Sequence, residues 1–311
     1  MAASLQFMLT RYSSAGPALM GGFVAFVAAR DVFFAATFQV ASFFVVVAVS
    51  FGLCTAVFLI FSVARNRADL RRALAQWPEV VAANATTAAA WLCYFAALGT
   101  TSPSVVNTLH AGIGPATILA IEGLGFAIAR AVPVSRAERR AQMLVLLSIM
   151  SLAAWTGLSG AGGALGALLA LASGIFITLA TLFVKRLNEK GLLPETVLAL
   201  RFVLITAIAV TAVAMDPDAT LAAAEAVRLV VAAMALIVLP VYLAQLGLAL
   251  TSPITASVIM STGPLFIFAL QSLEGRVPFS GVSLALIVAY CAIAATTAFL
   301  RGSALRARRL A

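Results

Sequence analysis

The only histidine of the chain, His110, lies inside a long apolar stretch, where it belongs to a polar stripe. Spacings of three, four and three residues place the members of this stripe on one helical face: Asn107, His110, Gly114 and Thr117. An ionisable ring inside a membrane is costly and normally faces a bundle interior or a watery cavity. The pattern therefore predicts that Asn107 and His110 contact a substrate, with His110 as a hydrogen-bonding or proton-exchanging group. The alternative is a neutral histidine bonded to a neighbouring helix.

A second stripe with the same spacing combines aromatic rings with polar tips: Asn84, Thr87, Trp91 and Tyr94. Such a wall suits a metabolite with apolar and polar parts, although ordinary helix packing explains single aromatic residues equally well. Further polar side chains in the second half of the chain could face the histidine: Tyr242, Gln245, Ser257 and Ser261. Serines in membrane helices often bond their own backbone, which is the simpler interpretation of the last two.

Few other charged residues interrupt the apolar stretches. Glu122 is a second candidate for proton coupling. Arg30 and Asp31 are adjacent and could pair with each other or with another helix. Glu274 and Arg276 lie near the end of a stretch, where we expect them to cap or gate one mouth of the protein.

The composition requires a membrane protein. Of the 311 residues, 63% are hydrophobic and only 10% are charged, whereas an ordinary globular domain has roughly 25% charged residues. The apolar stretches are continuous, which predicts membrane helices and no strands. We expect an all-α integral membrane protein with ten spans, near residues 15–35, 39–64, 78–99, 104–128, 141–159, 162–184, 196–215, 226–249, 253–272 and 280–300.

The basic residues predict how the chain lies in the membrane. Most of the 20 lysines and arginines fall in segments that share one side if both termini are cytoplasmic. This distribution predicts a multi-pass protein of the cytoplasmic (inner) membrane, and it explains the net charge of +9 without nucleic acid. The three cysteines lie in apolar runs, so we expect neither a metal site nor a cofactor.

A repeated motif divides the chain into two halves. The segment 97–103 (ALGTTSP) resembles 247–253 (GLALTSP), and a Gly-Pro pair follows each copy at matched spacing: Gly114-Pro115 and Gly263-Pro264. Five spans per half reverse the direction of the second half, which predicts two inverted five-helix repeats, 1–159 and 160–311. Because proline removes a backbone amide and glycine is permissive, both Gly-Pro pairs are candidate hinges.

These features resemble the drug/metabolite transporter superfamily, specifically its ten-span EamA-type members. The resemblance covers both halves and includes the two TSP-to-GP segments, Glu274-Gly275-Arg276, and Arg201 in LALRFVL. The first half has no counterpart of Arg201. The resemblance implies a transporter whose central cavity is lined by spans 1, 3, 4, 6, 8 and 9, usually exporting amino acids, metabolites or drugs.

We therefore expect a secondary-active transporter, an exporter of small metabolites that works by alternating access and could be proton-coupled. No phosphate-binding loop of an ATPase is present. An intramembrane lipid-modifying enzyme is a weaker alternative because a single histidine offers little catalytic chemistry, and a non-transporting receptor or assembly factor is a third. Gly162 and Gly166 form a small-xxx-small pattern that could serve packing within the chain or a homodimer contact.

Overall fold

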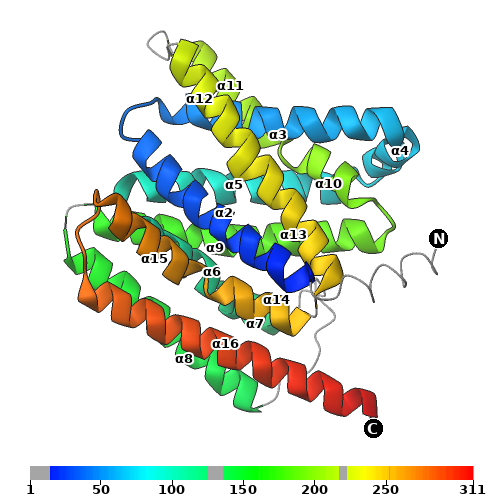
Figure 1. Ribbon diagram of the computed structural model, residues 1–311. Coiled ribbons are helices and arrows are strands. Elements are labelled where there is room, and N and C mark those ends of the chain that lie inside the picture. Colours follow the sequence, from blue (N-terminus) through cyan, green and yellow to red (C-terminus); the bar gives the residue numbers. More distant parts are fainter. Residues whose placement is uncertain (1–14, 125–135, 161, 217–222, 252, 311) are drawn as a thin grey trace.

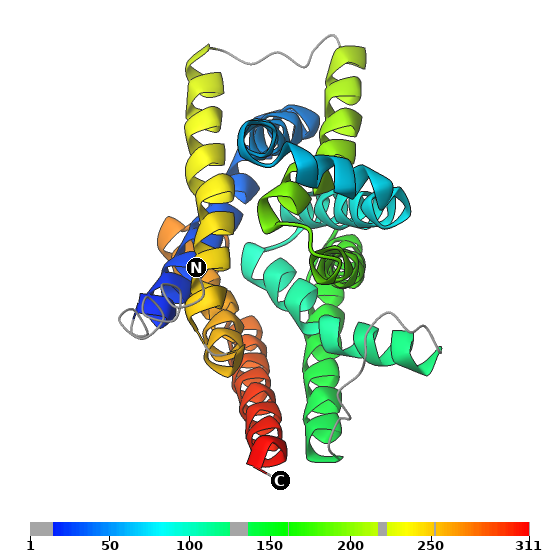
Figure 2. The same cartoon turned by 90° about the vertical axis from the view of Figure 1, so that its right-hand side faces the viewer.

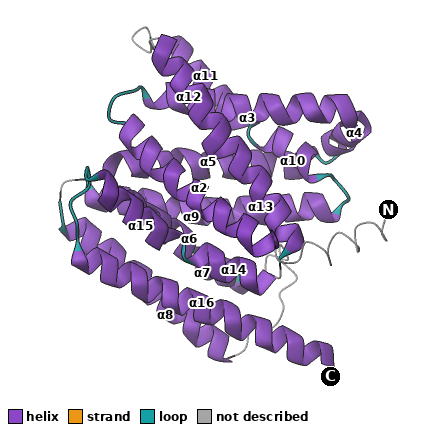
Figure 3. Cartoon of the chain, in the orientation of Figure 1, coloured by secondary structure: helices purple, strands orange, loops and turns teal. Residues whose placement is uncertain are grey.

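The computed structural model describes residues 15–124, 136–160, 162–216, 223–251 and 253–310, all of whose regular elements are helices (Figure 3). In these segments ten helices are long and apolar enough to span a membrane. The protein is thus an all-α, multi-pass integral membrane protein, as the sequence predicts. The first five spans are α2 (Ala15–Thr37), α3 (Phe43–Arg65), α5 (Trp77–Thr100), α6 with α7 (Pro103–Gly112 and Gly114–Gly123) and α8 (Arg136–Leu158).

The remaining spans are α9 (Gly163–Glu189), α10 with α11 (Pro194–Arg201 and Val203–Met215), α12 with the π-helical η1 and α13 (Ala223–Ala233, Met234–Val238 and Leu239–Leu250), α14 with α15 (Pro253–Ser261 and Gly263–Glu274), and α16 (Gly281–Leu310). The ends of these spans lie within several residues of the predicted ones. One short helix, α4 (Arg67–Ala75), was not predicted. It lacks the length and apolar surface of a span, and Asp69 ties it to α10 by accepting the backbone amide of Leu193 at 2.9 Å.

Both Gly-Pro pairs interrupt a span. The break between α6 and α7 falls at Ile113, and the break between α14 and α15 falls at Thr262, so each proline is the second residue of the following helix. Proline has no amide hydrogen and clashes with the carbonyl four residues earlier, which accounts for both breaks.

A third break, at Phe202 between α10 and α11, has neither glycine nor proline. The side chain of Asn84 on α5 compensates for it, because Asn84 Oδ1 accepts the amide of Leu204 at 3.1 Å. Asn84 therefore supports the backbone of a neighbouring span.

The spans form two groups that face one another (Figure 1, Figure 2). In Figure 2 one group contains α2, α12 to α15 and α16, and the other contains α5 to α9 with α11. Helix α3 packs against α11 and α12 and so joins the groups along one side, while α8 and α16 pack together along the opposite side. Helices from both sequence halves are interleaved in each group: α9 packs on α5, and α13 packs on α2.

An aromatic cluster packs α2, α3 and α5 against one another. Phe95 on α5 packs against Phe34 of α2 and Phe51 of α3, with ring centroids 5.2 and 5.8 Å apart. Phe51 also stacks on Phe202, at 5.3 Å. These rings bury a large apolar area beside the polar residues described below, and they fix the positions of α2, α3 and α5.

Candidate functional site

Asp31 is the centre of a buried polar cluster. It lies on α2, is fully buried, and accepts hydrogen bonds from three side chains. The hydroxyl of Tyr94 on α5 donates to Oδ2 at 2.6 Å, and the Nδ2 group of Asn107 on α6 donates to the same oxygen at 3.2 Å. Nε of Arg30 donates to Oδ1 at 2.8 Å. A buried carboxylate is tolerated only when it is paired and hydrogen-bonded, and both conditions are met here.

The guanidinium of Arg30 extends the cluster over an aromatic wall. Its central carbon lies 5.1 Å from the ring centroid of Trp91 and 5.6 Å from that of Tyr94, within the range of a cation–π interaction. The indole Nε1 of Trp91 is buried and has no partner among the described residues. Of the second predicted stripe, Trp91 and Tyr94 thus lie together beneath the guanidinium of Arg30.

His110 lies beside this cluster and bonds a different helix. Its Nδ1 is 2.9 Å from the hydroxyl oxygen of Ser173 on α9, and the Ser173 hydroxyl is 2.7 Å from the carbonyl oxygen of Ala90. Because a hydroxyl has one proton and a carbonyl only accepts, Ser173 donates to Ala90 and accepts from His110. Nδ1 therefore carries a proton, and in the neutral ring Nε2 would be an acceptor. The Tyr94 ring lies against the imidazole, with centroids 4.7 Å apart.

The bonds of Asp31 connect the two groups of helices. Asp31 belongs to the group of α2, whereas Tyr94 and Asn107 belong to the other. A second connection lies nearby, where the buried side chain of Gln271 on α15 accepts the backbone amide of Ser104 at 3.1 Å. Both connections lie toward the same end of the bundle. Asp31 and Tyr94 are each about two helical turns before the ends of α2 and α5. Ser104 lies at the start of α6, which follows α5, and Gln271 lies in the last turn of α15.

One of the two Gly-Pro breaks lies against the Asp31 cluster, and the other lies against α9. A methyl group at Gly263 would lie 3.8 Å from Oδ1 of Asn107 and 3.9 Å from Val24 of α2. A methyl group at Gly114 would lie 3.2 Å from the hydroxyl of Thr178 on α9. The break between α14 and α15 thus places an interrupted backbone beside Asn107, which bonds the buried carboxylate of Asp31. Such an arrangement can hold a polar solute or a proton and change shape around it.

Several predicted site residues make no hydrogen bond to the Asp31 cluster. Thr87 is buried one turn from Trp91 but its hydroxyl has no partner among the described residues. Tyr242 and Ser257 are exposed, and the hydroxyl of Ser261 donates to the carbonyl of Val258 on its own helix. Asn84 supports the break at Phe202, as described above.

The remaining predictions concern Gln245, Glu122 and the Gly162–Gly166 pattern. The backbone of Gln245 lies in α13, but its side chain is outside the described residues. Glu122 lies near the end of α7, about three helical turns beyond His110 in sequence, and the structure gives it no bond to the Asp31 cluster. Gly162, in a left-handed conformation, precedes α9, and Gly166 is buried against Thr100 and Thr101 within the chain.

The residues that sequence reasoning underrated are Asp31, Ser173 and Gln271. The signal for Asp31 was available, since an acidic residue beside an arginine in an apolar stretch indicates a neutralised pair inside the membrane. Ser173 and Gln271 gave no local signal, because their importance comes from contacts with α5 and α6 that depend on the tertiary fold.

Comparisons with known proteins establish the fold and no more. No protein-family model matches the chain, and no curated protein matches it in sequence. A solved crystal structure of a protein has the same fold, with a TM-score of 0.62 and 19% sequence identity. The match covers 92% of this chain and 98% of that chain, so the likeness extends over most of the chain.

Proposed function

We propose that the protein is a secondary-active transporter that exports small metabolites, such as amino acids or drug-like solutes, by alternating access. The observation that carries this proposal is an asymmetry between the two ends of the bundle. At one end, Asp31 with Tyr94 and Asn107, and Gln271 with Ser104, connect the two groups of helices. At the other end, α7 is turned away from α14 (Figure 2). A bundle closed at one end and divergent at the other suits one state of an alternating-access cycle.

Two inverted five-helix repeats, 1–159 and 160–311, would account for the way the helices pair. Exchanging each span with its counterpart five spans later converts the α5–α9 contact into the α13–α2 contact. It also converts the contact of α6 with α9 into that of α14 with α2. The interruption of the fourth span of each half at a Gly-Pro pair supports the same relationship. The ten-span fold and these motifs support an EamA-type transporter.

The pairs that connect the groups would break during transport. Opening the closed end separates α2 and α15 from α5 and α6, so the bonds of Asp31 and Gln271 must be replaced by bonds to water or to the substrate. The breaks at Gly114-Pro115 and Gly263-Pro264 allow α6 to move relative to α7, and α15 relative to α14. The charge distribution favours a closed end that lies outside and termini that both lie in the cytoplasm, in an inner membrane.

Proton coupling would act through Asp31. The groups that face its carboxylate are Arg30 on its own helix, Tyr94 on α5 and Asn107 on α6, with His110 behind Tyr94. Protonation of Asp31 would remove the negative charge that these donors bond, and so would weaken the connection between the groups. His110 would contribute an acceptor, Nε2, for substrate or proton.

The test is a flux assay in proteoliposomes with amino acids, polyamines, nucleosides, sugars and cationic drugs, each with and without an imposed proton gradient. Candidate solutes are first selected by thermal stabilisation of the purified protein, because a ligand that binds the native state raises its stability. We expect accelerated flux of at least one solute, lost in Asp31→Asn. If no solute moves faster than through protein-free vesicles, although some stabilise the protein, the chain is a receptor and the transporter proposal is wrong.

A further inference from the structure

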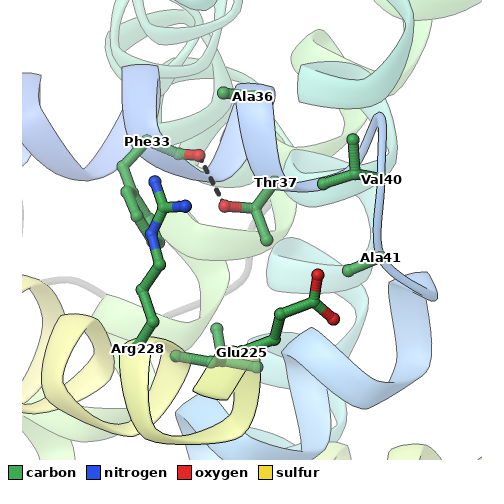
Figure 4. Close-up of a pocket in the computed structure, with 8 residues that line it drawn as sticks. Phe33, Ala36, Thr37, Val40, Ala41, Glu225 and Arg228 are labelled. Carbon is green, nitrogen blue, oxygen red and sulfur yellow. Dashed lines mark hydrogen bonds between the residues drawn. The ribbon is translucent and has the colours of Figure 1, made fainter. Parts of the chain in front are cut away.

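A pocket of about 200 Å³ lies between the end of α2 and the start of α12 (Figure 4). Its walls are mostly apolar, and three polar side chains line it: Thr37 from α2, and Glu225 and Arg228 from α12. By the charge distribution this is the external face, the same end at which Asp31 and Gln271 connect the two groups of helices. The pocket is separate from that cluster, since Arg30, Asp31, Tyr94 and Asn107 are not among its lining residues.

Glu225 and Arg228 face the pocket without pairing with each other. An acid and a base three residues apart on a helix are neighbours, and they commonly form an ion pair. Here the described residues supply neither with an ion-pair partner. The Arg228 guanidinium instead lies 5.6 Å from the ring centroid of Phe33, whereas the Glu225 carboxylate extends toward Ala41 (Figure 4). One pocket thus presents a positive and a negative group at separate positions.

Thr37 adds an acceptor between these two charges. Its hydroxyl donates to the carbonyl of Phe33 at 2.8 Å, which uses its only proton, so toward the pocket it can only accept. Figure 4 shows Thr37 between Arg228 and Glu225. The pocket therefore offers N–H donors at Arg228 and oxygen acceptors at Thr37 and Glu225. The end of α2 adds a partial negative charge on the acceptor side.

These features define the ligand by charge and size. Donors on one side and acceptors on the other match a molecule that carries an anionic and a cationic group. The lining by Phe33, Ala36, Val40, Ala41 and Leu229 matches an apolar portion. The volume lies below the roughly 300–1,000 Å³ of sites for drug-sized molecules, which limits the ligand to about the size of an amino acid.

Ordinary structural roles account for the two charged residues only in part. An acid in the first turn of a helix is favourable, which accounts for Glu225, and an arginine at a span end can reach the headgroup region, which accounts for Arg228. Neither role accounts for the way the two side chains turn apart around a pocket, or for the position of Arg228 against Phe33.

We infer that this pocket is an outer binding site for a small zwitterion with an apolar side chain, of the α-amino acid class. Arg228 binds the carboxylate, Glu225 and Thr37 bind the ammonium group, and Phe33 with its apolar neighbours covers the side chain. As a step on the transport path the site rests on the proposed function, but binding to it does not.

The wall formed by α2 is already held in place. Arg276, after α15, donates to the carbonyls of Ala35 and Val32 at 3.3 and 3.5 Å, and so fixes the end of α2 to the neighbouring span. A ligand that joins α12 to this wall would add a connection at the external end. The site would thereby hold a solute molecule beside the transport path while the external end of the bundle is closed.

A labelling experiment tests binding without relying on flux. Val40 lines the pocket and is 84% exposed, so Val40→Cys can react with a membrane-impermeant maleimide. The parent chain, in which Cys54 and Cys291 are buried and Cys93 is partly buried, gives the background. The probes are L-leucine, 3-methylbutylamine, which lacks the carboxylate, and 4-methylpentanoate, which lacks the ammonium group.

We expect that leucine slows the labelling of Val40→Cys. Either single-charge analogue should need about tenfold higher concentration for the same protection, because it lacks one charged contact. A tenfold change in affinity corresponds to about 1.4 kcal/mol. Glu225→Gln should weaken protection by leucine to the level of the amine-free analogue, and Arg228→Gln to that of the carboxylate-free one. Equal protection by all three probes would overturn the zwitterion assignment, and no protection by any would overturn the site.

Two further arms separate binding in the pocket from transport and from binding of a lipid headgroup. Asp31→Asn should abolish flux and leave the protection of Val40→Cys unchanged, so a failed transporter proposal does not remove the outer site. Repeating the labelling in nanodiscs with and without phosphatidylethanolamine tests a lipid headgroup as the zwitterion. Protection that requires this lipid and ignores leucine would overturn the amino acid assignment.

Discussion

The hydroxyl of Tyr94 donates to Oδ2 of Asp31 at 2.6 Å, and this bond joins α5 to α2 in a buried position. The two residues come from helices that belong to different groups of the bundle. Their bond therefore contributes both to stability and to the closed state of one end. Variants at this pair should therefore affect both stability and flux.

Replacing Tyr94 with phenylalanine should destabilise the purified protein by about 1.5–3 kcal/mol, because a hydrogen bond to a charged group is lost. Flux should fall as well, since the closed end forms less readily. Thermal unfolding in detergent and flux in proteoliposomes measure the two effects. Tyr242→Phe is the matched control, because Tyr242 is 55% exposed and no described residue bonds its hydroxyl. Equal effects in both variants would remove Tyr94 from the site.

The sequence predicted the ten spans because each is a continuous apolar run of sufficient length, a property that needs no knowledge of neighbouring helices. It also predicted the stripes of Asn107 and His110 and of Trp91 and Tyr94, which the structure brings together around Asp31. The partners across helices were not predictable. Whether His110 bonds Ser173 depends on how α6 packs on α9, and no local pattern encodes that contact.

Ser173→Ala should lower flux by about tenfold while leaving the protein folded, because Nδ1 of His110 loses its acceptor and the ring is no longer held in one tautomer. Ser148→Ala is the control, since the Ser148 hydroxyl bonds only a carbonyl of its own helix. Solute flux and thermal stability of both variants are measured together. A large loss of stability without a change in flux would mean that the His110–Ser173 bond is only structural.

Gly174→Ala should destabilise the protein by about 1–3 kcal/mol, the usual cost of forcing an extra group into a packed interior. The added methyl group would overlap the carbonyl oxygen of His110 and the side chain of Ile113, and so would push α6 away from α9. Gly99→Ala, on helix α5, meets nothing within 4 Å and should be neutral or slightly stabilising. Similar unfolding temperatures for the two variants would contradict this account of the contact between α6 and α9.

Gln271→Leu should open the closed end, because the backbone amide of Ser104 loses its acceptor inside the membrane. Val24 faces Gly263 and is 3% exposed, so a Val24→Cys background reports this opening through its reaction with a membrane-impermeant maleimide. We expect faster labelling in Gln271→Leu than in Ser272→Ala, whose hydroxyl bonds only the carbonyl of Phe268. Unchanged labelling would mean that the bond between Gln271 and Ser104 does not contribute to closure.

The prolines of the two interrupted spans provide the strongest test of movement. Pro115→Ala supplies an amide hydrogen-bond donor, which lets α6 continue into α7, and Pro264→Ala does the same for α14 and α15. Straightening either span should stiffen it, so we expect flux to fall several-fold while the unfolding temperature stays equal or rises.

Pro194→Ala is the control for these proline variants, because Pro194 begins α10 and its missing amide interrupts no helix. Its flux should match that of the parent. If Pro115→Ala and Pro264→Ala also transport at the parent rate, the breaks at Ile113 and Thr262 are static features of the fold. The two groups must then move relative to one another at the contacts of α3 with α11 and α12, and of α16 with α8.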